Sequence, residues 1–307
     1  MVKEIEFSLP PDLINNNEHH LKLCAKKLKV NPHEITAVKI QKRSVDARKK
    51  PVFRLKAAVF INQKPVEDLP TFNFTPVKSG KRVLIVGSGP AGLFAALRLI
   101  ELGIKPIILE RGKNVRDRRF DIKAIMRDGI VNSESNYCFG EGGAGTYSDG
   151  KLYTRSNKRG SVKRIIELLI LHGADENIRI DSHPHIGSNK LPKIVKNIRE
   201  TILHCEGEFR FNSKVTDFII NDGKMKGVVV NNNHEIIGDA VILATGHSSR
   251  DIYNIFRDRK LRIEAKPFAM GVRIEHPQSL IDSIQYKSES RHENLPASSY
   301  NLTCQIN

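Results

Sequence analysis

The first sixty residues alternate between polar and apolar positions with two different periods, which predict a small α+β module. Residues 2–8 alternate with the period of a strand, and residues 35–45 and 51–61 do so again. Residues 17–30 instead repeat apolar positions with the period of a helix, and Asn17 or a neighbouring asparagine is suited to cap it. The apolar face of this helix comprises Leu21, Cys24, Ala25 and Leu28.

The pattern changes at Lys81, after a segment at 63–79 that contains three prolines and little periodicity. We interpret that segment as a linker. The stretch "KRVLIVGSGPAGLFAALRLIELGIKPIILERG" then predicts a continuously apolar strand, a glycine turn, a long apolar helix and a second apolar strand. Strands that are apolar throughout are typical of a parallel sheet covered on both faces.

Further periodic segments continue this pattern. Helical periods cover 161–173 and 189–204, short strands occur near 208–230, and "AVILAT" predicts a strand at 240–245. The fold class is therefore α/β, with a Rossmann-like domain, a parallel sheet flanked by helices, preceded by the small α+β module. The boundaries that we expect are 1–62 for the module, 63–79 for the linker, 80–275 for the Rossmann-like domain and 276–307 for the start of a further, truncated domain.

The glycine turn matches the fingerprint G-x-G-x-x-G directly after a strand and at the start of a helix. Gly87 permits the tight turn, Gly89 lets the backbone approach a pyrophosphate, and Gly92 lets the helix pack against the strand. The free N–H groups and the dipole of the helix would meet the phosphate charge. We therefore predict a dinucleotide site at Gly87, Ser88, Gly89, Pro90, Ala91 and Gly92.

A carboxylate follows the second strand of this unit. Glu110 lies 18 residues after Gly92, where an acidic side chain accepts hydrogen bonds from ribose hydroxyls. Arg111 beside it suggests a 2′-phosphate, which the carboxylate disfavours. These residues do not distinguish NAD from FAD, since both cofactors share the ADP half that the turn would bind.

Residues 138–150, "CFGEGGAGTYSDG", contain five glycines and no apolar face. Because glycine loses more backbone entropy on ordering than any other residue, this stretch predicts neither a stable helix nor a stable strand. A main chain without side chains is suited to a close approach to a ligand.

Three stretches, "VGSGPAGLFAALRL…ILERG", "FGEGGAGTYSDGKLYTR" and "VILATGHSSRDIY", together resemble a bacterial family of FAD-dependent dehydrogenases, the NAD(FAD)-utilizing dehydrogenases. "KRSVDARKKP" and "KPFAMGVRIEHPQSLID" also match, so the resemblance covers nearly the whole chain. It implies a FAD fold of the glutathione-reductase type and the activity of a FAD-dependent oxidoreductase on a small-molecule substrate. Whether NADH or NADPH is the reductant stays open, because no second G-x-G-x-x-G directly follows a predicted strand.

The resemblance also implies which residues meet the cofactor. Related flavoproteins have "ERG" after the second strand and "ATG" at the end of a later strand, here Glu110-Arg111-Gly112 and Ala244-Thr245-Gly246. The loop after the second strand would follow the flavin side, with backbone groups and hydroxyl donors along the cofactor. Its expected contact residues are Gly142, Gly143, Ala144, Gly145, Thr146 and Ser148.

The charge of the chain raises an alternative function. The formal net charge is +16, and residues 1–80 carry 15 Lys and Arg against 8 Asp and Glu. A basic hairpin at Arg48, Lys49 and Lys50 is suited to contact RNA phosphates, which would make the protein a nucleic-acid-associated flavoprotein, RNA-binding or RNA-modifying. The strands of this module lack the aromatic pair on which bases stack.

Composition and cysteine spacing limit the expected location of the protein and the kinds of site that it contains. No apolar run approaches the roughly 18 residues of a membrane span, and the N-terminus has no apolar signal core, so we expect a cytoplasmic protein without a membrane partner. Cys24, Cys138, Cys205 and Cys304 form no C-x-x-C pair, which argues against a disulfide framework, a zinc site and a dithiol redox centre. We predict no metal.

These patterns identify no catalytic residue. Cys138 has an acidic neighbour, Glu141, rather than a basic one, so packing is favoured over a reactive thiol. His183 and His185 alternate in an extended stretch and fit either a substrate contact or a turn. His247 follows the "ATG" triplet, and its role stays open.

The resemblance also raises an expectation about the end of the chain. FAD folds of this type return to the cofactor late in the sequence, on a strand that ends in Gly-Asp, whereas Gly238-Asp239 lies before the "ATG" strand. Family members are longer, with glycine-rich segments beyond this point. We therefore expect an N-terminal fragment that carries the adenosine and pyrophosphate half of the FAD site and lacks part of the flavin side.

Overall fold

The computed structural model describes residues 1–65, 69–78, 80–154, 160–187, 189–267, 271–272 and 274–300. Parts of three sequence features therefore lie outside the described residues: 66–68 and 79 of the expected linker, 155, 268–270 and 273 of the family stretches, and 301–307 with Cys304. The chain divides into two compact units, one of Met1–Leu69, Glu176–Pro184 and Pro267–Asn307 and the other of Pro70–Asp175 and His185–Lys266.

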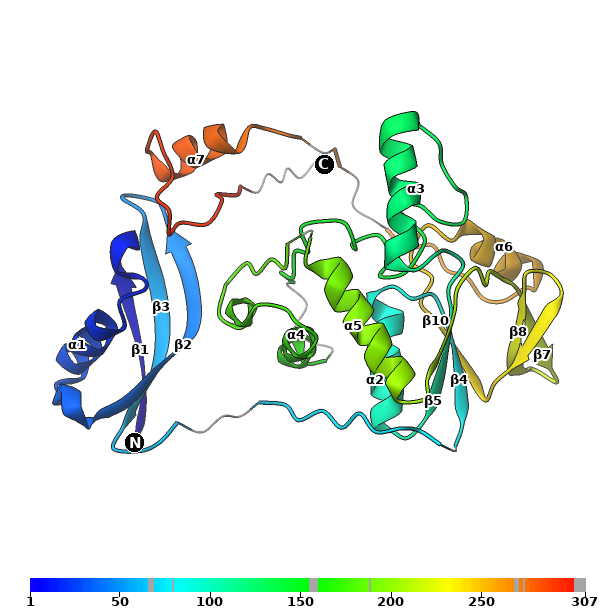
Figure 1. Ribbon diagram of the computed structural model, residues 1–307, viewed down its shortest axis with the longest axis horizontal. Helices are drawn as coiled ribbons and strands as arrows, with labels where there is room; N and C mark the ends of the chain where they lie inside the picture. The colour runs from blue at the N-terminus through cyan, green and yellow to red at the C-terminus, as the bar shows by residue number, and fades with distance from the viewer. Residues whose placement is uncertain are drawn as a thin grey trace. The chain divides into compact units, whose positions relative to one another are not determined.

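The first unit is built on an antiparallel sheet with the strand order β1-β3-β2 (Figure 1). The strands are β1 (Val2–Leu9), β2 (Ile35–Asp46) and β3 (Val52–Ile61), and helix α1 (Asn17–Leu28) lies between the first two in sequence. These elements confirm the ones that the alternation predicts, and the side chain of Asn16 caps the helix. Alternate residues of the strands, among them Phe7, Leu55 and Val59, pack on Cys24 and Ala25 of the helix.

Two later segments complete the first unit. Helix α7 (Gln278–Tyr286) and the segment after it add Tyr286 and Leu295 to the same core. Residues 180–182 run beside β2, where the Arg43 amide donates to the Ile180 carbonyl at 2.7 Å and the Ser182 amide donates to the Arg43 carbonyl at 2.9 Å. The Arg43 guanidinium also pairs with Asp181, with Nε and Oδ1 2.7 Å apart. Long-range pairing of this kind leaves no local signal in the sequence.

The second unit contains a parallel four-stranded sheet with the order β10-β4-β5-β6. The Rossmann-like fold class is therefore confirmed. Register is regular, since Val86 at the end of β4 lies beside both Leu109 of β5 and Leu243 of β10. The strands are β4 (Arg82–Val86), β5 (Lys105–Leu109), β6 (Glu208–Arg210) and β10 (Ala240–Leu243).

Both faces of this sheet are covered, which explains why its central strands are apolar throughout. Helices α2 (Pro90–Glu101) and α5 (Leu191–His204) lie on one face, and an antiparallel meander lies on the other (Figure 1). Leu84, Val86, Ile107 and Leu109 pack on the meander, with Phe218 among their partners. The meander consists of β7 (Val215–Asn221), β8 (Lys224–Val230) and β9 (His234–Ile237), and α6 (Arg250–Asp258) packs beside it.

Two more helices complete the described part of this unit, α3 (Val115–Asp128) and α4 (Val162–Leu171). The helical period at 161–173 predicts α4, but the sequence patterns did not indicate α3. Its sequence, "VRDRRFDIKAIMRD", is mostly polar, and Asn114 caps it by accepting hydrogen bonds from two of its first amides. In the described part of the first unit, short 3₁₀ helices occupy Pro11–Leu13, Pro32–Glu34 and Glu176–Arg179.

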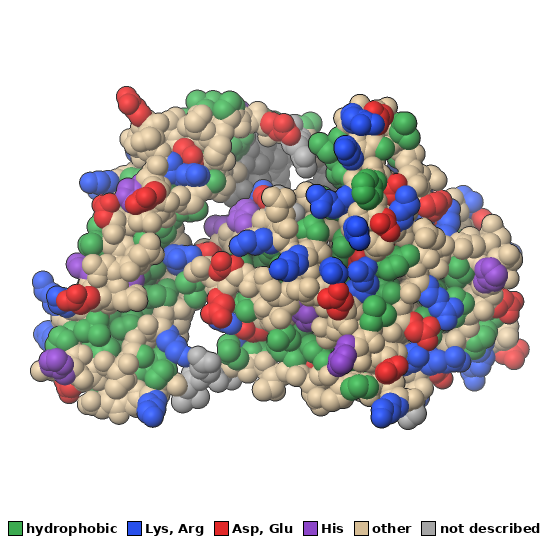
Figure 2. All heavy atoms as spheres, viewed as in Figure 1, with side chains coloured by type: hydrophobic (Ala, Val, Ile, Leu, Met, Phe, Trp, Pro, Cys, Tyr) green, Lys and Arg blue, Asp and Glu red, His purple; other side chains and the backbone are tan. Residues whose placement is uncertain are grey.

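Charged side chains are mixed over the surface. On the face in Figure 2, Lys and Arg are spread over both units and are interspersed with Asp and Glu. In the basic turn of the first unit, Arg48 is paired with Asp46, with Nη2 and Oδ2 2.7 Å apart. In the described part of the chain, no helix has the length and apolar character needed to span a bilayer.

We predict that His172 makes the second unit less stable in acid. This side chain is buried, with Nδ1 2.6 Å from the Leu168 carbonyl oxygen and Nε2 3.1 Å from Thr201 Oγ1. Burial penalises the charged ring and lowers the pKa of His172, so the unfolded chain binds a proton more readily near pH 6.5. The free energy of unfolding should therefore fall as the pH falls from 7.5 to 5.5.

Urea unfolding of the cofactor-free protein at several pH values tests this prediction. His172→Gln should reduce the pH dependence by on the order of 1 kcal/mol over that range, because the variant has no ring to protonate. His234 on β9 is exposed, and His234→Gln is the control that should keep the wild-type slope. An unchanged slope in His172→Gln would contradict the assignment.

Candidate functional site

The site lies at the carboxyl edge of the parallel sheet, where three segments that are far apart in sequence meet. β4, β5 and β10 run in the same direction and end level with one another. Carboxyl ends of parallel strands are where open α/β sheets bind their ligands. The residues that directly follow the three strands are Gly87, Glu110 and Ala244.

The turn after β4 is so tight that its outer glycines cannot carry side chains. Gly87 has a φ of +104°, and a Cβ atom on it would lie 2.5 Å from the Ala244 carbonyl oxygen. A Cβ atom on Gly92 would lie 2.0 Å from the Gly87 carbonyl oxygen. These two glycines are therefore required by the packing of the turn against β10 and α2, whether or not a ligand is bound.

The middle glycine differs from its neighbours. Gly89 is the N-cap of α2 and has an ordinary extended backbone, with φ −69°. A Cβ atom on it would meet only the Gly143 Cα atom, at 3.8 Å. Among the described residues, the amides of Gly89, Ala91 and Gly92 donate to no protein acceptor, and Pro90 has no N–H. Free amides at the positive end of a helix are suited to bind an anion.

The glycine-rich loop docks directly on this turn. The Gly142 amide donates to the Ser88 carbonyl at 2.9 Å, and a Cβ atom on Gly143 would lie 3.2 Å from the Gly89 Cα atom. Gly140, Gly142 and Gly143 all have positive φ values, which other residues rarely adopt. The loop is therefore an ordered structure of consecutive turns rather than a flexible surface segment.

A fully buried arginine holds the loop from behind. Arg118 on α3 is 0% exposed. Its Nη1 donates to the carbonyls of Glu141 at 2.8 Å and Gly143 at 2.9 Å, and its Nε donates to the Asn136 carbonyl at 2.9 Å. Further bonds reach the carbonyls of Tyr137 and Gly140 and the hydroxyl of Thr146. Sequence reasoning missed this residue, and no spacing in the polar helix around it would have revealed it.

Glu141 provides a buried negative charge close to this arginine. Its Oε2 accepts hydrogen bonds from the Val115 amide at 2.7 Å and from Arg199 Nη1 at 2.8 Å, while Oε1 has no partner among the described residues. Burial raises the pKa of Glu141 above its ordinary value, against the opposing effect of the Val115 hydrogen bond. The carboxylate thus ties the loop to the start of α3 and to α5.

Glu110 is directed mainly into the protein. It is 4% exposed, and each of its two oxygens accepts two hydrogen bonds. Oε2 accepts from the amide and hydroxyl of Ser88, at 2.9 and 2.7 Å. Oε1 accepts from the amides of Gly112 and Gly140, at 2.9 and 3.0 Å. One carboxylate therefore joins the glycine turn, the end of β5 and the glycine-rich loop.

The third segment follows β10 and leads into α6. The Ala244 amide donates to the Val86 carbonyl at 2.9 Å, which extends the sheet pairing by one residue. The Ser249 hydroxyl donates to the Thr245 carbonyl at 2.8 Å and fixes the turn before the helix. His247 lies in this turn, and its Nε2 is 3.4 Å from the Ser248 hydroxyl.

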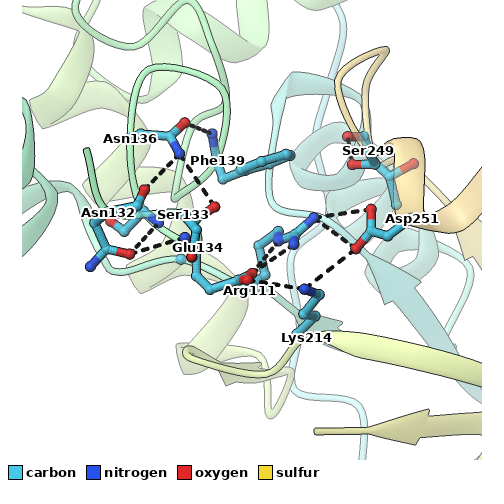
Figure 3. Close-up of polar contacts among 12 residues, drawn as sticks. Arg111, Asn132, Ser133, Glu134, Asn136, Phe139, Lys214, Ser249 and Asp251 are labelled. Atoms are coloured by element: carbon cyan, nitrogen blue, oxygen red, sulfur yellow. Dashed lines mark hydrogen bonds and ion pairs between the residues drawn. The ribbon is translucent and has the colours of Figure 1, made fainter.

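A cluster of paired charges closes one end of the site (Figure 3). The Arg111 guanidinium lies between Glu134 and Asp251, with Nε 2.7 Å from Glu134 Oε2 and Nη1 3.0 Å from Asp251 Oδ2. The Lys214 ammonium is 2.9 Å from Glu134 Oε1 and 3.8 Å from Asp251. Arg111 also lies over the Phe139 ring, 4.1 Å from its centroid. Both cations are thus matched by carboxylates.

These elements enclose a cavity of about 550 Å³, within the range of ligand pockets. It is lined by residues of the turn, the loop and the post-β10 segment, together with the start of β7 and α6. Most of the residues predicted from sequence line it: Gly87, Gly89, Pro90, Ala91, Glu110, Arg111, Gly143, Ala144, Ala244, Thr245 and Gly246.

The other predicted residues do not line the cavity. Ser88 is buried and its hydroxyl donates a hydrogen bond to Glu110, and Gly92 packs on the turn. The Thr146 hydroxyl donates within the loop to the Gly143 carbonyl at 2.9 Å, and the Ser148 hydroxyl donates to the Gly145 carbonyl at 2.7 Å. Gly142 and Gly145 also lie outside the lining.

Two other residues that sequence analysis considered lie at this cavity. Cys138 is exposed and His247 lies in the turn before α6, and both contribute to the lining. His185 lies elsewhere, with Nδ1 3.5 Å from Asp149 Oδ2. In the part of the chain that the structure describes, no three His, Cys, Asp or Glu side chains are placed to hold a metal ion.

Three segments of the chain match known protein families. Residues 1–60 match a domain of unknown function, and residues 267–307 match the C-terminal domain-like part of FAD-dependent proteins. Residues 81–255, which include the whole cavity up to α6, match the pyridine nucleotide-disulphide oxidoreductases.

Individual proteins are also similar. An uncharacterized protein of Clostridium beijerinckii is 41% identical over 321 residues, which cover 99% of this chain and 59% of that protein. The chain thus spans about three fifths of the length of that relative.

Several solved structures overlap with the fold at low similarity. THI4 of Thermovibrio ammonificans is 17% identical over 59% of this chain and 64% of its own, with a TM-score of 0.38. OTEMO in complex with FAD and NADP is 16% identical over 56% of this chain and 26% of its own, with a TM-score of 0.33. CtdE in complex with FAD is 21% identical over 57% of this chain and 40% of its own, with a TM-score of 0.33.

The family match rests on the same residues that build the cavity. It begins at the first strand of the parallel sheet and ends within α6, and it covers more than half of the 307 residues. The chain therefore belongs to the pyridine nucleotide-disulphide oxidoreductase family.

Proposed function

We propose that this chain is the cofactor-binding part of a FAD-dependent oxidoreductase that acts on a small-molecule substrate. The observation that carries the proposal is the cavity at the sheet edge, because it is lined by the glycine turn and the glycine-rich loop and includes the free amides at the start of α2. The match of residues 267–307 to FAD-dependent proteins supports FAD over a nicotinamide as the resident group.

In this proposal the pyrophosphate lies against the start of α2. The amides of Gly89 and Ala91 and the positive end of the helix dipole supply hydrogen bonds and partial charge to the phosphates. Gly89 and Gly143 leave a cradle that side chains would fill, and both line the cavity. The residues that are present therefore fit a diphosphate.

The adenosine half would lie toward the charged cluster. Glu110 lines the cavity, and acceptance of hydrogen bonds from ribose hydroxyls stays a prediction for its carboxylate. Arg111 and Lys214 are each neutralised by Glu134 and Asp251, so neither offers a free cation to a 2′-phosphate. This arrangement supports an adenosine without that phosphate, as in FAD.

The flavin ring supplies the hydride or electron transfer when FAD is bound. The loop residues Gly143 and Ala144 line the cavity and would approach the cofactor through their main chain, whereas Thr146 and Ser148 act by shaping the loop. The absence of C-x-x-C in the sequence leaves disulfide substrates without their usual partner on this chain. NADH or NADPH as the electron donor remains part of the proposal.

The alternative as a nucleic-acid-associated flavoprotein has no observation in its favour. Arg48 in the basic turn is already paired with Asp46, and charges of both signs are interspersed on the surface (Figure 2). A cytoplasmic location and an incomplete flavin side stay predictions.

We predict that Gly89→Ala weakens binding of both FAD and ADP by about tenfold or more, which corresponds to about 1.4 kcal/mol. The new methyl group would occupy space between Gly89 and Gly143 without a clash in the protein, so the melting temperature should not change. Calorimetric titration with ADP and fluorescence titration with FAD measure the effect.

Gly145→Ala is the matched control. Gly145 also has room for a Cβ atom, since its nearest neighbour would be Ser148 Oγ at 3.9 Å, but it does not line the cavity. This variant should bind ADP as wild type does. Equal ADP affinity in the wild type and both variants would place the nucleotide elsewhere.

We predict that Glu110→Ala lowers the free energy of unfolding of the cofactor-free protein by about 2–4 kcal/mol. The change leaves the amides of Ser88, Gly112 and Gly140 without their acceptor in a buried place. Glu208→Ala is the control, because that carboxylate is half-exposed and pairs with Lys105 and Arg210. If Glu110→Ala is as stable as the control yet binds ADP weakly, its carboxylate acts mainly on the ligand.

A further inference from the structure

Arg118 fixes the direction of several peptide units in the glycine-rich loop. Nη1 of its guanidinium donates to the carbonyls of Gly140, Glu141 and Gly143, at 3.3, 2.8 and 2.9 Å. Arg118 is 0% exposed, so water does not compete for these bonds. The three carbonyls therefore point away from the loop surface and toward the arginine.

The amides of the same peptide units must then point the other way. A trans peptide is planar, and its C=O and N–H groups lie on opposite sides. The N–H that follows the Gly140 carbonyl belongs to Glu141 and donates to the Lys113 carbonyl at 3.0 Å. The N–H that follows the Glu141 carbonyl belongs to Gly142 and donates to the Ser88 carbonyl at 2.9 Å. Two of the three amides thus anchor the loop.

The third amide has a different environment. The N–H that follows the Gly143 carbonyl belongs to Ala144, which is exposed and lines the cavity. Among the described residues it donates to no protein acceptor. Its neighbour Gly143 lies against Gly89, so the Ala144 amide is close to the free amides at the start of α2.

We propose that Arg118 is a positioning residue that turns the Ala144 amide toward the cavity, where this amide and the start of α2 together bind the pyrophosphate of the nucleotide. The inference rests on the proposed function and adds one donor from the glycine-rich loop to those of the helix terminus. The donors are fixed before the ligand arrives, so binding costs no ordering of the loop.

The surroundings of Arg118 fit this role. A Cβ atom on Gly140 would lie 2.4 Å from the Arg118 Cδ atom, so glycine is required there for the arginine to reach the carbonyls. The buried carboxylates of Glu110 and Glu141 balance its charge. A lysine could not replace it, because a single ammonium lacks the fork of donors that spans several carbonyls.

The test compares ADP with adenosine, which differ only in the phosphates. Arg118→Lys should weaken ADP binding by about tenfold or more while adenosine affinity stays within about twofold of wild type, as expected for loss of a hydrogen bond to a charged group. Arg164→Lys is the control, because Arg164 is a partly buried arginine that is paired with Glu101, but it lies on α4 and does not line the cavity. The control should bind both ligands as wild type does.

The results separate this inference from the function on which it rests. If the wild type binds ADP and folded Arg118→Lys keeps the same ratio of ADP to adenosine affinity, the inference is wrong and the nucleotide site stands. If the wild type binds neither ADP nor FAD, the proposed function fails and the inference fails with it. A general loss of structure would weaken ADP and adenosine equally, which also contradicts a positioning role.

A second variant removes the donor itself and keeps Arg118. Replacing Ala144 by lactic acid exchanges its amide for an ester, which deletes one N–H and leaves the side chain unchanged. The ester protein should show the same selective loss of about tenfold for ADP and no loss for adenosine. Wild-type ADP affinity in this protein would overturn the inference, even where Arg118→Lys does not fold.

Discussion

The site depends on one buried guanidinium. Arg118 replaces the hydrogen bonds that water would otherwise make to the carbonyls of a glycine-rich loop, and these bonds are made inside the protein, where an unmet carbonyl is costly. A loop of five glycines in thirteen residues has too few side chains to define its own conformation. The loop is ordered instead by hydrogen bonds from Arg118 on α3. The other face of this helix is exposed, with Phe120 and Met126 among its exposed residues.

Buried carboxylates complete this arrangement. Glu110 joins the turn to the loop through backbone amides, and Glu141 joins the loop to α3 and α5. Each carboxylate accepts hydrogen bonds mainly from donors that are fixed in place. These charge-assisted hydrogen bonds offset the free-energy cost of burying the two carboxylates. The glycine turn and the glycine-rich loop, which border the cavity, are thus held in place by buried ionic groups.

Local patterns in the sequence were sufficient for the sheet, its first helices and the glycine turn. β4, α2 and β5 follow one another directly, and their periods and the fingerprint are properties of short windows. The loop at 140–146 was recognised as a site from its glycines, but its conformation was not predictable, because Arg118 has no distinguishing spacing in a polar helix. Thr146 and Glu110 show the same limit: residue type predicted a ligand contact, whereas the direction of the side chain is set by donors and acceptors distant in sequence.

The glycines show how packing and binding share one motif. Gly87, Gly92 and Gly140 are excluded from carrying side chains by protein atoms within about 2.5 Å of the missing Cβ, so the fold alone requires them. Gly89 is free of such contacts, although it lies in the middle of the same fingerprint. A position where the protein leaves room for a side chain and the sequence still has glycine is best explained by a ligand that needs the room. In the proposed site, the pyrophosphate would therefore lie beside Gly89, between the start of α2 and the Ala144 amide.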